Sequence, residues 1–190
     1  MPPKTKFSKN EIIEAAFKIA SKEGFTGITA RSVAAKLKSS VAPIYVNFAT
    51  IDDLVRAVVE RVFAITDDLL AEQTSDSYFE RVGKASIELA RRYPVLFREL
   101  VLTQNPYLPD YETVQQGMIE ALADDENLHG LGPEERKRLF FKMQVFQTGL
   151  TELIANGHYP SWLSREQAEE LLLEVGKDLL TIEKQKRKEN

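Results

Sequence analysis

Apolar residues recur at helical spacing from the start of the chain. Residues 12–13 and 16–17 are apolar and share one face, because positions about 3.6 residues apart line up along a helix. Ser8 precedes Glu11 by the three positions of a capping box, so we expect the helix to begin at residue 9. Gly24 can adopt the left-handed conformation that ends a helix, and we expect it to end this one.

Two shorter helices are predicted next, with very little chain between them. Thr29 is a plausible N-cap for a second helix, and Ser40 for a third that covers about residues 41–47. Pro43 falls in the first turn of that third helix, where a missing amide hydrogen costs little. Only residues 38–39 separate the second helix from Ser40, so we expect a tight turn and two crossing helices.

A fourth helix should follow directly. Thr50 with Asp52 and Asp53 gives an acidic first turn, which the helix dipole favours. The expected buried stripe of this helix is Leu54, Val55, Val58, Val59 and Val62.

The rest of the chain keeps helical periodicity, interrupted by prolines and glycines. We expect helices over about residues 77–92, 94–104, 110–124 and 133–156, and a last one after the capping-box pair Ser164 and Gln167. No segment alternates as a strand would. The sequence therefore predicts an all-α fold, with an N-terminal three-helix domain at residues 1–50. The fourth helix would join it to a C-terminal helical domain at residues 51–190.

Charge is distributed unevenly over these two predicted domains. The net charge is −4, but residues 1–50 carry eight Lys and Arg against three Glu, so they hold +5 and the remainder holds −9. A basic unit on an acidic body is expected when one part contacts phosphates and the other does not. A chance unevenness of solvated surface charge is the alternative interpretation.

The composition narrows the class of protein. With 43% hydrophobic residues the chain can bury a sizeable core, and the absence of cysteine removes disulfides and thiolate chemistry. No apolar run approaches the roughly 20 residues that span a bilayer, and no signal-peptide pattern is present. We therefore expect a cytoplasmic protein with no membrane partner.

Residues that could support catalysis lack the necessary spacing. His129 and His158 lie in glycine-bearing loops without the i, i+4 pairing of a helical zinc site. The acidic run at residues 124–127 lacks EF-hand spacing, and we expect it to be a solvated loop. We therefore expect no enzyme, no metal and no cofactor, although a helical enzyme remains a less favoured alternative.

The stretch from Ile28 to Leu54 resembles the signature of the TetR family of bacterial transcriptional regulators. In that signature a Thr precedes the second helix, an aliphatic-Ala pair lies within it, and an aliphatic-Tyr-x-x-Phe pattern closes the third. The matching positions are Thr29, Val33, Ala34, Ser40, Ile44, Tyr45, Phe48 and Leu54. The resemblance covers about residues 9–58 and implies a helix-turn-helix that binds double-stranded operator DNA.

The resemblance also implies which residues contact DNA. The implied set is Thr29, Arg31, Lys36, Lys38, Ser40, Val41, Ala42, Pro43, Tyr45, Val46 and Asn47. The apolar residues of the third helix can pack against thymine methyl groups but cannot hydrogen-bond to guanine or adenine. Arg31 matches a base-reading arginine of the family and is our first choice for guanine, with Asn47 for adenine. Arg31 gripping only phosphate is an equally supported alternative.

Two positions depart from the family pattern. Lys38 stands where the family usually has glycine in the turn, which costs about 1 kcal/mol if the backbone there is left-handed. Ile51 stands where the family usually has lysine at the start of the fourth helix, which removes one expected phosphate contact. The amino terminus of that helix could still receive a phosphate.

For the C-terminal domain the resemblance implies a homodimer through the last two long helices, a palindromic operator, and release by a small, largely apolar effector. The predicted effector-binding residues are Phe97, Val101, Gln104, Tyr107, Tyr111, Met118, Phe141, Met143, Phe146 and Gln147. Each of the apolar residues among these can also be explained as plain core. A DNA-binding dimer without an effector is the alternative function.

Overall fold

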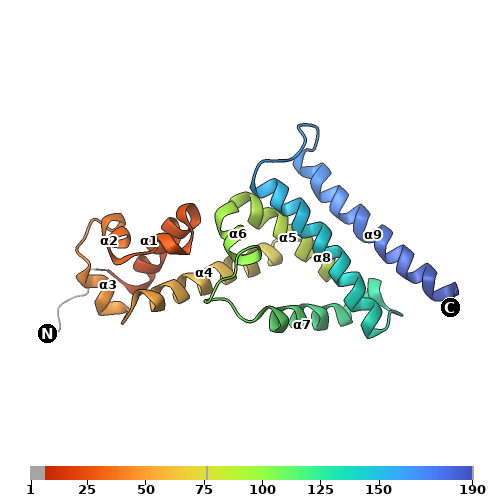
Figure 1. Cartoon of the computed structure of the whole chain (residues 1–190), viewed down its shortest axis with the longest axis horizontal. Helices are drawn as coiled ribbons and strands as arrows, with labels where there is room; N and C mark the ends of the chain where they lie inside the picture. The colour runs from red at the N-terminus through yellow and green to blue at the C-terminus, as the bar shows by residue number, and fades with distance from the viewer. Residues whose placement is uncertain (1–6, 76, 190) are drawn as a thin grey trace. The chain divides into compact units, whose positions relative to one another are not determined.

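A computed structural model describes residues 7–75 and 77–189, without the side chains of Tyr111, Asp124, Arg165 and residues 187–189. Over these residues the regular structure is helical, as predicted (Figure 1). Contacts divide the chain into two compact units: Met1–Asp67 with Tyr93–Leu108, and Asp68–Arg92 with Pro109–Asn190. The expected domain boundary at residue 50 falls inside the first unit.

The first unit holds the N-terminal helices. They are α1 (Lys9–Glu23), the 3-10 turn η1 (Phe25–Gly27), α2 (Ala30–Lys36), α3 (Ala42–Asn47), α4 (Ile51–Ala71) as far as Asp67, and α6 (Pro94–Val101). α1 packs against α2 and α6, and α2 against α3. Ile12, Val33, Ile44 and Leu54 are fully buried, so each of the first four helices contributes to the core.

Short-range hydrogen bonds start three of these helices where the sequence predicted. Ser8 N–H donates to Glu11 Oε2 over 2.7 Å and Glu11 N–H donates back to Ser8 Oγ over 3.3 Å, which completes the expected capping box. Thr29 accepts from Ser32 N–H at 3.0 Å, and Thr50 accepts from Asp53 N–H at 3.1 Å. The expected stripe of α4 is buried throughout.

The predicted cap at Ser40 is wrong. α3 begins at Ala42, its N-cap is Val41, and no side chain caps it. An N-cap hydroxyl bonds the N–H two or three residues later. Three residues after Ser40 stands Pro43, which has no N–H, so the first helical carbonyl is that of Val41, which accepts from Ile44 N–H at 3.0 Å.

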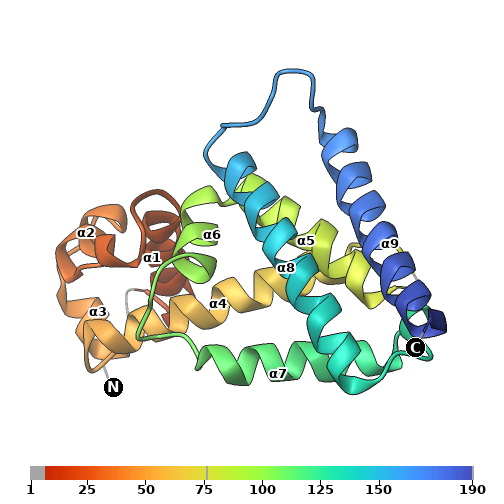
Figure 2. The same cartoon turned by 45° about the vertical axis from the view of Figure 1, so that its right-hand side comes forward.

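The second unit is a helical bundle. It holds α5 (Tyr78–Arg92), α7 (Tyr111–Ala121), the 3-10 turns η2 (Leu122–Asp124) and η3 (Glu126–Leu128), α8 (Pro133–Ala155) and α9 (Arg165–Glu189). α5, α8 and α9 pack against one another, and α7 packs against α8 (Figure 2). A core cluster includes Leu122, Leu128, Leu139, Phe140 and Met143.

One residue of the run 124–127 contradicts the expectation of a solvated loop. Asp125 is only 4% exposed, and its carboxylate accepts from Ser77 Oγ at 2.7 Å and from Phe79 N–H at 3.5 Å. It also accepts from Asn127 N–H at 2.9 Å. Burial raises the pKa of Asp125, but these hydrogen bonds outweigh burial and lower the pKa below its ordinary value. Asp125 therefore caps the start of α5 from a distant part of the chain.

Candidate functional sites

The third helix turns large apolar side chains toward solvent. Val41, Tyr45 and Val46 are exposed, with 52% of Tyr45 and 67% of Val46 accessible. Ile44 and Phe48 lie on the opposite side and are buried, which fixes α3 to the core. Exposed apolar groups gathered on a six-residue helix form a surface suited to another apolar surface, such as thymine methyl groups.

The other predicted DNA contacts lie on α2, on the turn that follows it and on α3 itself. Thr29, Arg31, Lys36, Lys38, Ser40 and Ala42 are exposed, whereas Pro43 and Asn47 are half-buried. Asn47 Nδ2 donates to the Pro43 carbonyl over 2.8 Å, so one of its two amide hydrogens is engaged within α3. Arg31 lies in the first turn of α2 and takes part in no ion pair within the described part of the chain.

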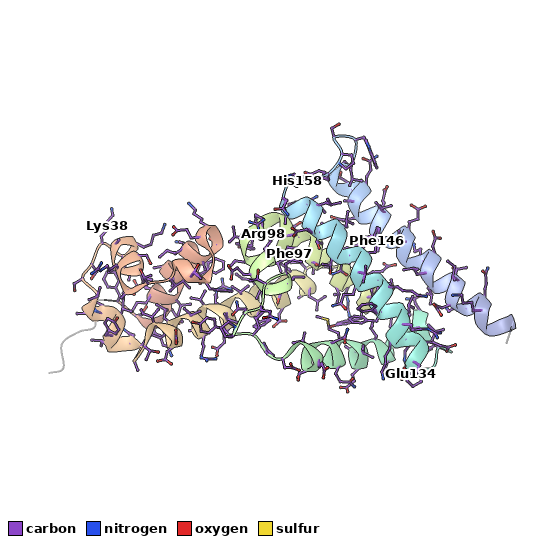
Figure 3. All side chains as sticks on the ribbon, viewed as in Figure 1. Lys38, Phe97, Arg98, Glu134, Phe146 and His158 are labelled. Atoms are coloured by element: carbon purple, nitrogen blue, oxygen red, sulfur yellow. The ribbon has the colours of Figure 1, made fainter. Side chains whose placement is uncertain are left out.

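The turn between α2 and α3 has the strained conformation that its sequence suggested. Lys38 has a φ of 51°, in the left-handed region that glycine tolerates better than lysine. Its side chain points away from the neighbouring helices (Figure 3). The turn therefore keeps a cation beside α3 at some cost in backbone energy.

The amino terminus of α4 carries negative charge. Asp53 Oδ2 accepts from Thr50 N–H at 2.9 Å, and Asp52 Oδ1 accepts from the Tyr107 hydroxyl at 3.0 Å. Arg56 lies 5.5 Å from the centre of the Tyr107 ring. A phosphate at this helix terminus would meet these two carboxylates, which oppose the attraction of the helix amino terminus for an anion.

α6 belongs to the first unit and packs on α1. The rings of Phe17 and Tyr93 meet edge to face, with centroids 5.6 Å apart. Glu99 Oε1 lies so close to Gly24, which has a φ of 76°, that a Cβ added at Gly24 would stand 2.5 Å from it. Gly24 thus serves two needs at once, the positive φ that ends α1 and the close approach of α6.

The predicted effector residues are divided between the two units. Phe97, Val101, Gln104 and Tyr107 belong to the first unit, and Met118, Phe141, Met143, Phe146 and Gln147 to the second. Phe97 is buried, Val101 is exposed, and Tyr107 bonds Asp52. The side chain of Tyr111 lies outside the described residues.

A cavity of about 90 Å³ lies within the second unit, between α5, α8, α9 and the 3-10 turns. Among the predicted effector residues whose side chains are described, Met143 alone lines it. The sequence analysis missed the contributions of Phe79, Lys177 and Leu180. Lys177 and Leu180 stand three positions apart on α9, which places them on one face, but nothing in the sequence shows that α5 meets that face.

The described residues contain neither a metal-binding cluster nor a membrane-spanning helix. No group of three or more His, Cys, Asp or Glu side chains there is placed to hold a metal ion. None of the described helices is both long and apolar enough to cross a membrane.

Comparison with known families gives one match. Residues 12–58 match the family described as "Bacterial regulatory proteins, tetR family". The matched segment begins within α1 and ends within α4, so it contains α2, the turn and the whole of α3. No curated protein matches the chain significantly.

Solved structures share the fold over most of the chain. A TetR-like transcriptional regulator from Rhodococcus sp. RHA1 has a TM-score of 0.69 at 16% identity, over 91% of this chain and 95% of its own. A putative TetR-family regulator from Vibrio parahaemolyticus has a TM-score of 0.60 at 19% identity, over 90% and 96%. The fatty acid degradation regulator FadR from Bacillus halodurans has a TM-score of 0.58 at 16% identity, over 90% and 94%.

Proposed function

We propose that this chain is a transcriptional regulator of the TetR family and a ligand-responsive repressor, because its residues 12–58 match that family and its fold resembles that of such regulators. As a cytoplasmic homodimer it would bind a palindromic operator and leave it when a small effector binds. The observation that carries the proposal is the matched segment itself, since its third helix exposes Val41, Tyr45 and Val46 within a basic stretch of sequence.

We propose that some residues of this surface contact phosphates and others contact bases. Exposed Thr29, Lys36, Lys38 and Ser40 contact phosphates and set the register, while α3 packs Val41, Ala42, Pro43 and Val46 against base edges. Arg31 reads guanine, because it is the long cation at the start of α2 and has no carboxylate partner among the described residues. Tyr45 contacts sugar-phosphate. Asn47 reads adenine with the amide hydrogen that Pro43 leaves available.

An exposed apolar face on α8 supports the homodimer. Phe141 and Val145 are 55% and 58% exposed, and Leu153 follows at a multiple of the same four-residue spacing. Gly149 completes the stripe, with nothing near its Cα that an added Cβ would meet. Ile182 adds an exposed apolar side chain on α9. A second copy that covers this face would remove these side chains from water and place two α3 helices about 34 Å apart, or a multiple of that.

The effector acts, in this proposal, through α4. This helix contributes residues to both compact units, so a shift of its second half can be transmitted to its first turn. Linkage then requires operator DNA to weaken effector binding by the same factor by which effector weakens operator binding.

The DNA-binding proposal is tested by fluorescence anisotropy of the full chain with fragments that flank its own gene, at fixed salt. Wild type should bind one fragment selectively, and Arg31→Ala and Tyr45→Ala should each weaken that binding by at least about tenfold. Lys137→Ala is the matched control, since it removes a cation of the second unit that pairs with Glu134 at 3.0 Å. Equal weak binding of every fragment by wild type and variants would refute sequence-selective DNA binding through Arg31 and Tyr45.

The dimer proposal is tested by sedimentation of Val145→Glu. A carboxylate in an apolar dimer face is costly to bury, so this variant should sediment as a monomer and lose operator affinity by about a hundredfold. Glu174→Gln, at an exposed position of α9, is the control for a change of surface charge. A dimeric Val145→Glu variant would move the interface away from this stripe.

A further inference from the structure

Apolar side chains from three helices line the cavity of the second unit. Phe79 comes from α5, Leu139 and Met143 from α8, and Leu180 from α9. Gly176 opens the space, because a Cβ there would stand 2.8 Å from Met143 Cε and 3.6 Å from the ring of Phe79. A glycine at the middle of a helix is unfavourable by itself, so its presence here matches a need for room.

Two cations also line this apolar cavity. Arg136 reaches it from α8 and Lys177 from α9. Neither forms an ion pair with any carboxylate in the described part of the chain, although acidic side chains are abundant on the same helices. Among the described residues of the lining, Glu80 has a carboxylate, and it already accepts from Ser75 Oγ at 2.9 Å.

We propose that this cavity binds a small organic anion, with its apolar part against Phe79 and Met143 and its carboxylate or similar group between Arg136 and Lys177. A neutral or cationic ligand would leave both cations without a counter-charge. The anion's role as the effector rests on the proposed function, but its binding does not. None of the predicted effector residues except Met143 takes part.

The volume limits the size of the ligand. An apolar cavity of about 150 Å³ can bind benzene. The cavity here is smaller, at about 90 Å³, but it has an open side, so we expect a short alkyl chain or a single ring to enter it with the charged end at the mouth. Aromatic and short aliphatic carboxylates fit this description, and long acyl chains do not.

Methionine labelling gives a probe inside the cavity. The chain has three methionines, so the full-length protein labelled with [ε-13C]methionine gives at most three methyl signals. The Met143 signal is identified by its loss in Met143→Leu. We expect benzoate to shift the Met143 signal saturably, and the isosteric amide benzamide and the cation benzylamine to bind at least about tenfold more weakly.

Charge variants test the two cations. Lys177→Gln and Arg136→Gln should each weaken benzoate binding by about three- to tenfold. Lys184→Gln, two helical turns from Lys177 on α9 and also exposed, should leave it unchanged. Circular dichroism confirms that each variant is folded.

Three results would overturn the inference: no Met143 shift with benzoate, an equal shift with benzamide, or full benzoate affinity in the double variant of Arg136 and Lys177. Operator binding of the same samples separates this failure from failure of the proposed function. If wild type binds its operator but not benzoate, only the cavity assignment is wrong.

Discussion

Both compact units start helices with local caps, since Asp110 caps α7 and Ser164 pairs with Gln167 ahead of α9, but the start of α5 in the second unit is different. In the first unit the caps are local: Ser8 pairs with Glu11, Thr29 with Ser32 and Thr50 with Asp53. In the second unit α5 starts from Ser77, whose hydroxyl donates to Asp125, 48 residues away and buried. Ser77 Oγ also accepts locally from Glu80 N–H at 3.4 Å, but the hydrogen bonds to Asp125 exist only when the 3-10 turns are packed in place.

The exposed local caps and the buried Asp125 cap should also differ in how much they stabilise the fold. The local caps lie at exposed positions, where water can replace a lost partner. The Asp125 cap is buried, so removing the carboxylate leaves donors that water cannot easily reach. Burial, and not only separation in sequence, should decide how much each contact stabilises its unit.

Loss of the buried cap should have the largest effect. Asp125→Ala leaves the hydroxyl of Ser77 and the N–H groups of Phe79 and Asn127 without their acceptor, so we expect the free energy of unfolding to fall by about 3 kcal/mol. Ser8→Ala removes a local cap and should cost about 1 kcal/mol. Urea unfolding measures both, and equal losses would refute the contrast between the units.

Acid should remove the same contribution. The folded state holds the pKa of Asp125 below its ordinary value, so the stabilisation is present above that value and is lost as the pH falls through the folded pKa. The difference in stability between wild type and Asp125→Ala should therefore narrow as the pH is lowered from about 5 toward 3. A constant difference over this range would show that the charge of Asp125 is not involved.

A second buried carboxylate joins α8 to α9. Glu183 is 2% exposed; it accepts from Lys142 and pairs with Arg138 at 3.4 Å, and the Lys142 hydrogen bond leads the contacts that lower its pKa. Glu183→Gln should lower the free energy of unfolding by about 2 kcal/mol, less than Asp125→Ala, because both cations can turn to water. Glu174→Gln on the same helix is the exposed control. A loss below that of the control would show that the pair contributes nothing.

A substitution in the strained turn of the first unit should increase stability, in contrast to the substitutions above. Lys38→Gly should raise the free energy of unfolding by about 1 kcal/mol, because glycine tolerates the φ of 51° without the steric cost of a Cβ. Lys36→Gly, in the last turn of α2, loses the same charge but should destabilise by about 1 kcal/mol. Thermal unfolding of the two variants compares them. Destabilisation by both would mean that the turn is not strained.

The smallest expected loss of stability comes from a contact that is remote in sequence but exposed. The Tyr107 hydroxyl bonds Asp52 across 55 residues, but at an exposed position. Tyr107→Phe should therefore cost less than about 1 kcal/mol, although the contact is as remote in sequence as that of Asp125. A loss equal to that of Asp125→Ala would show that sequence separation, and not burial, sets the energy.

The DNA-binding segment could be predicted in detail because its determinants are close in sequence. Ser8 with Glu11 placed the start of α1, Thr29 that of α2, and the apolar spacing of Ile44 and Phe48 the buried side of α3. The prediction that Ser40 caps α3 was wrong, because a cap also depends on the N–H that Pro43 lacks. The cavity could not be predicted, because Phe79 and Lys177 are almost one hundred residues apart and no local pattern joins them.

The sequence by itself determined the helices and the caps made by near neighbours, because each depends on side chains within about one helical turn of one another. It also contains the segment 12–58 that matches the tetR-family description. The tertiary structure alone decided that Asp125 is buried, that Glu183 meets Lys142 and Arg138, and that α5, α8 and α9 line a cavity with Arg136 and Lys177. Neither of these two cations has an ion-pair partner among the described residues. Burial and charge pairing depend on which faces meet, and helical periodicity identifies the faces of a helix but not their partners.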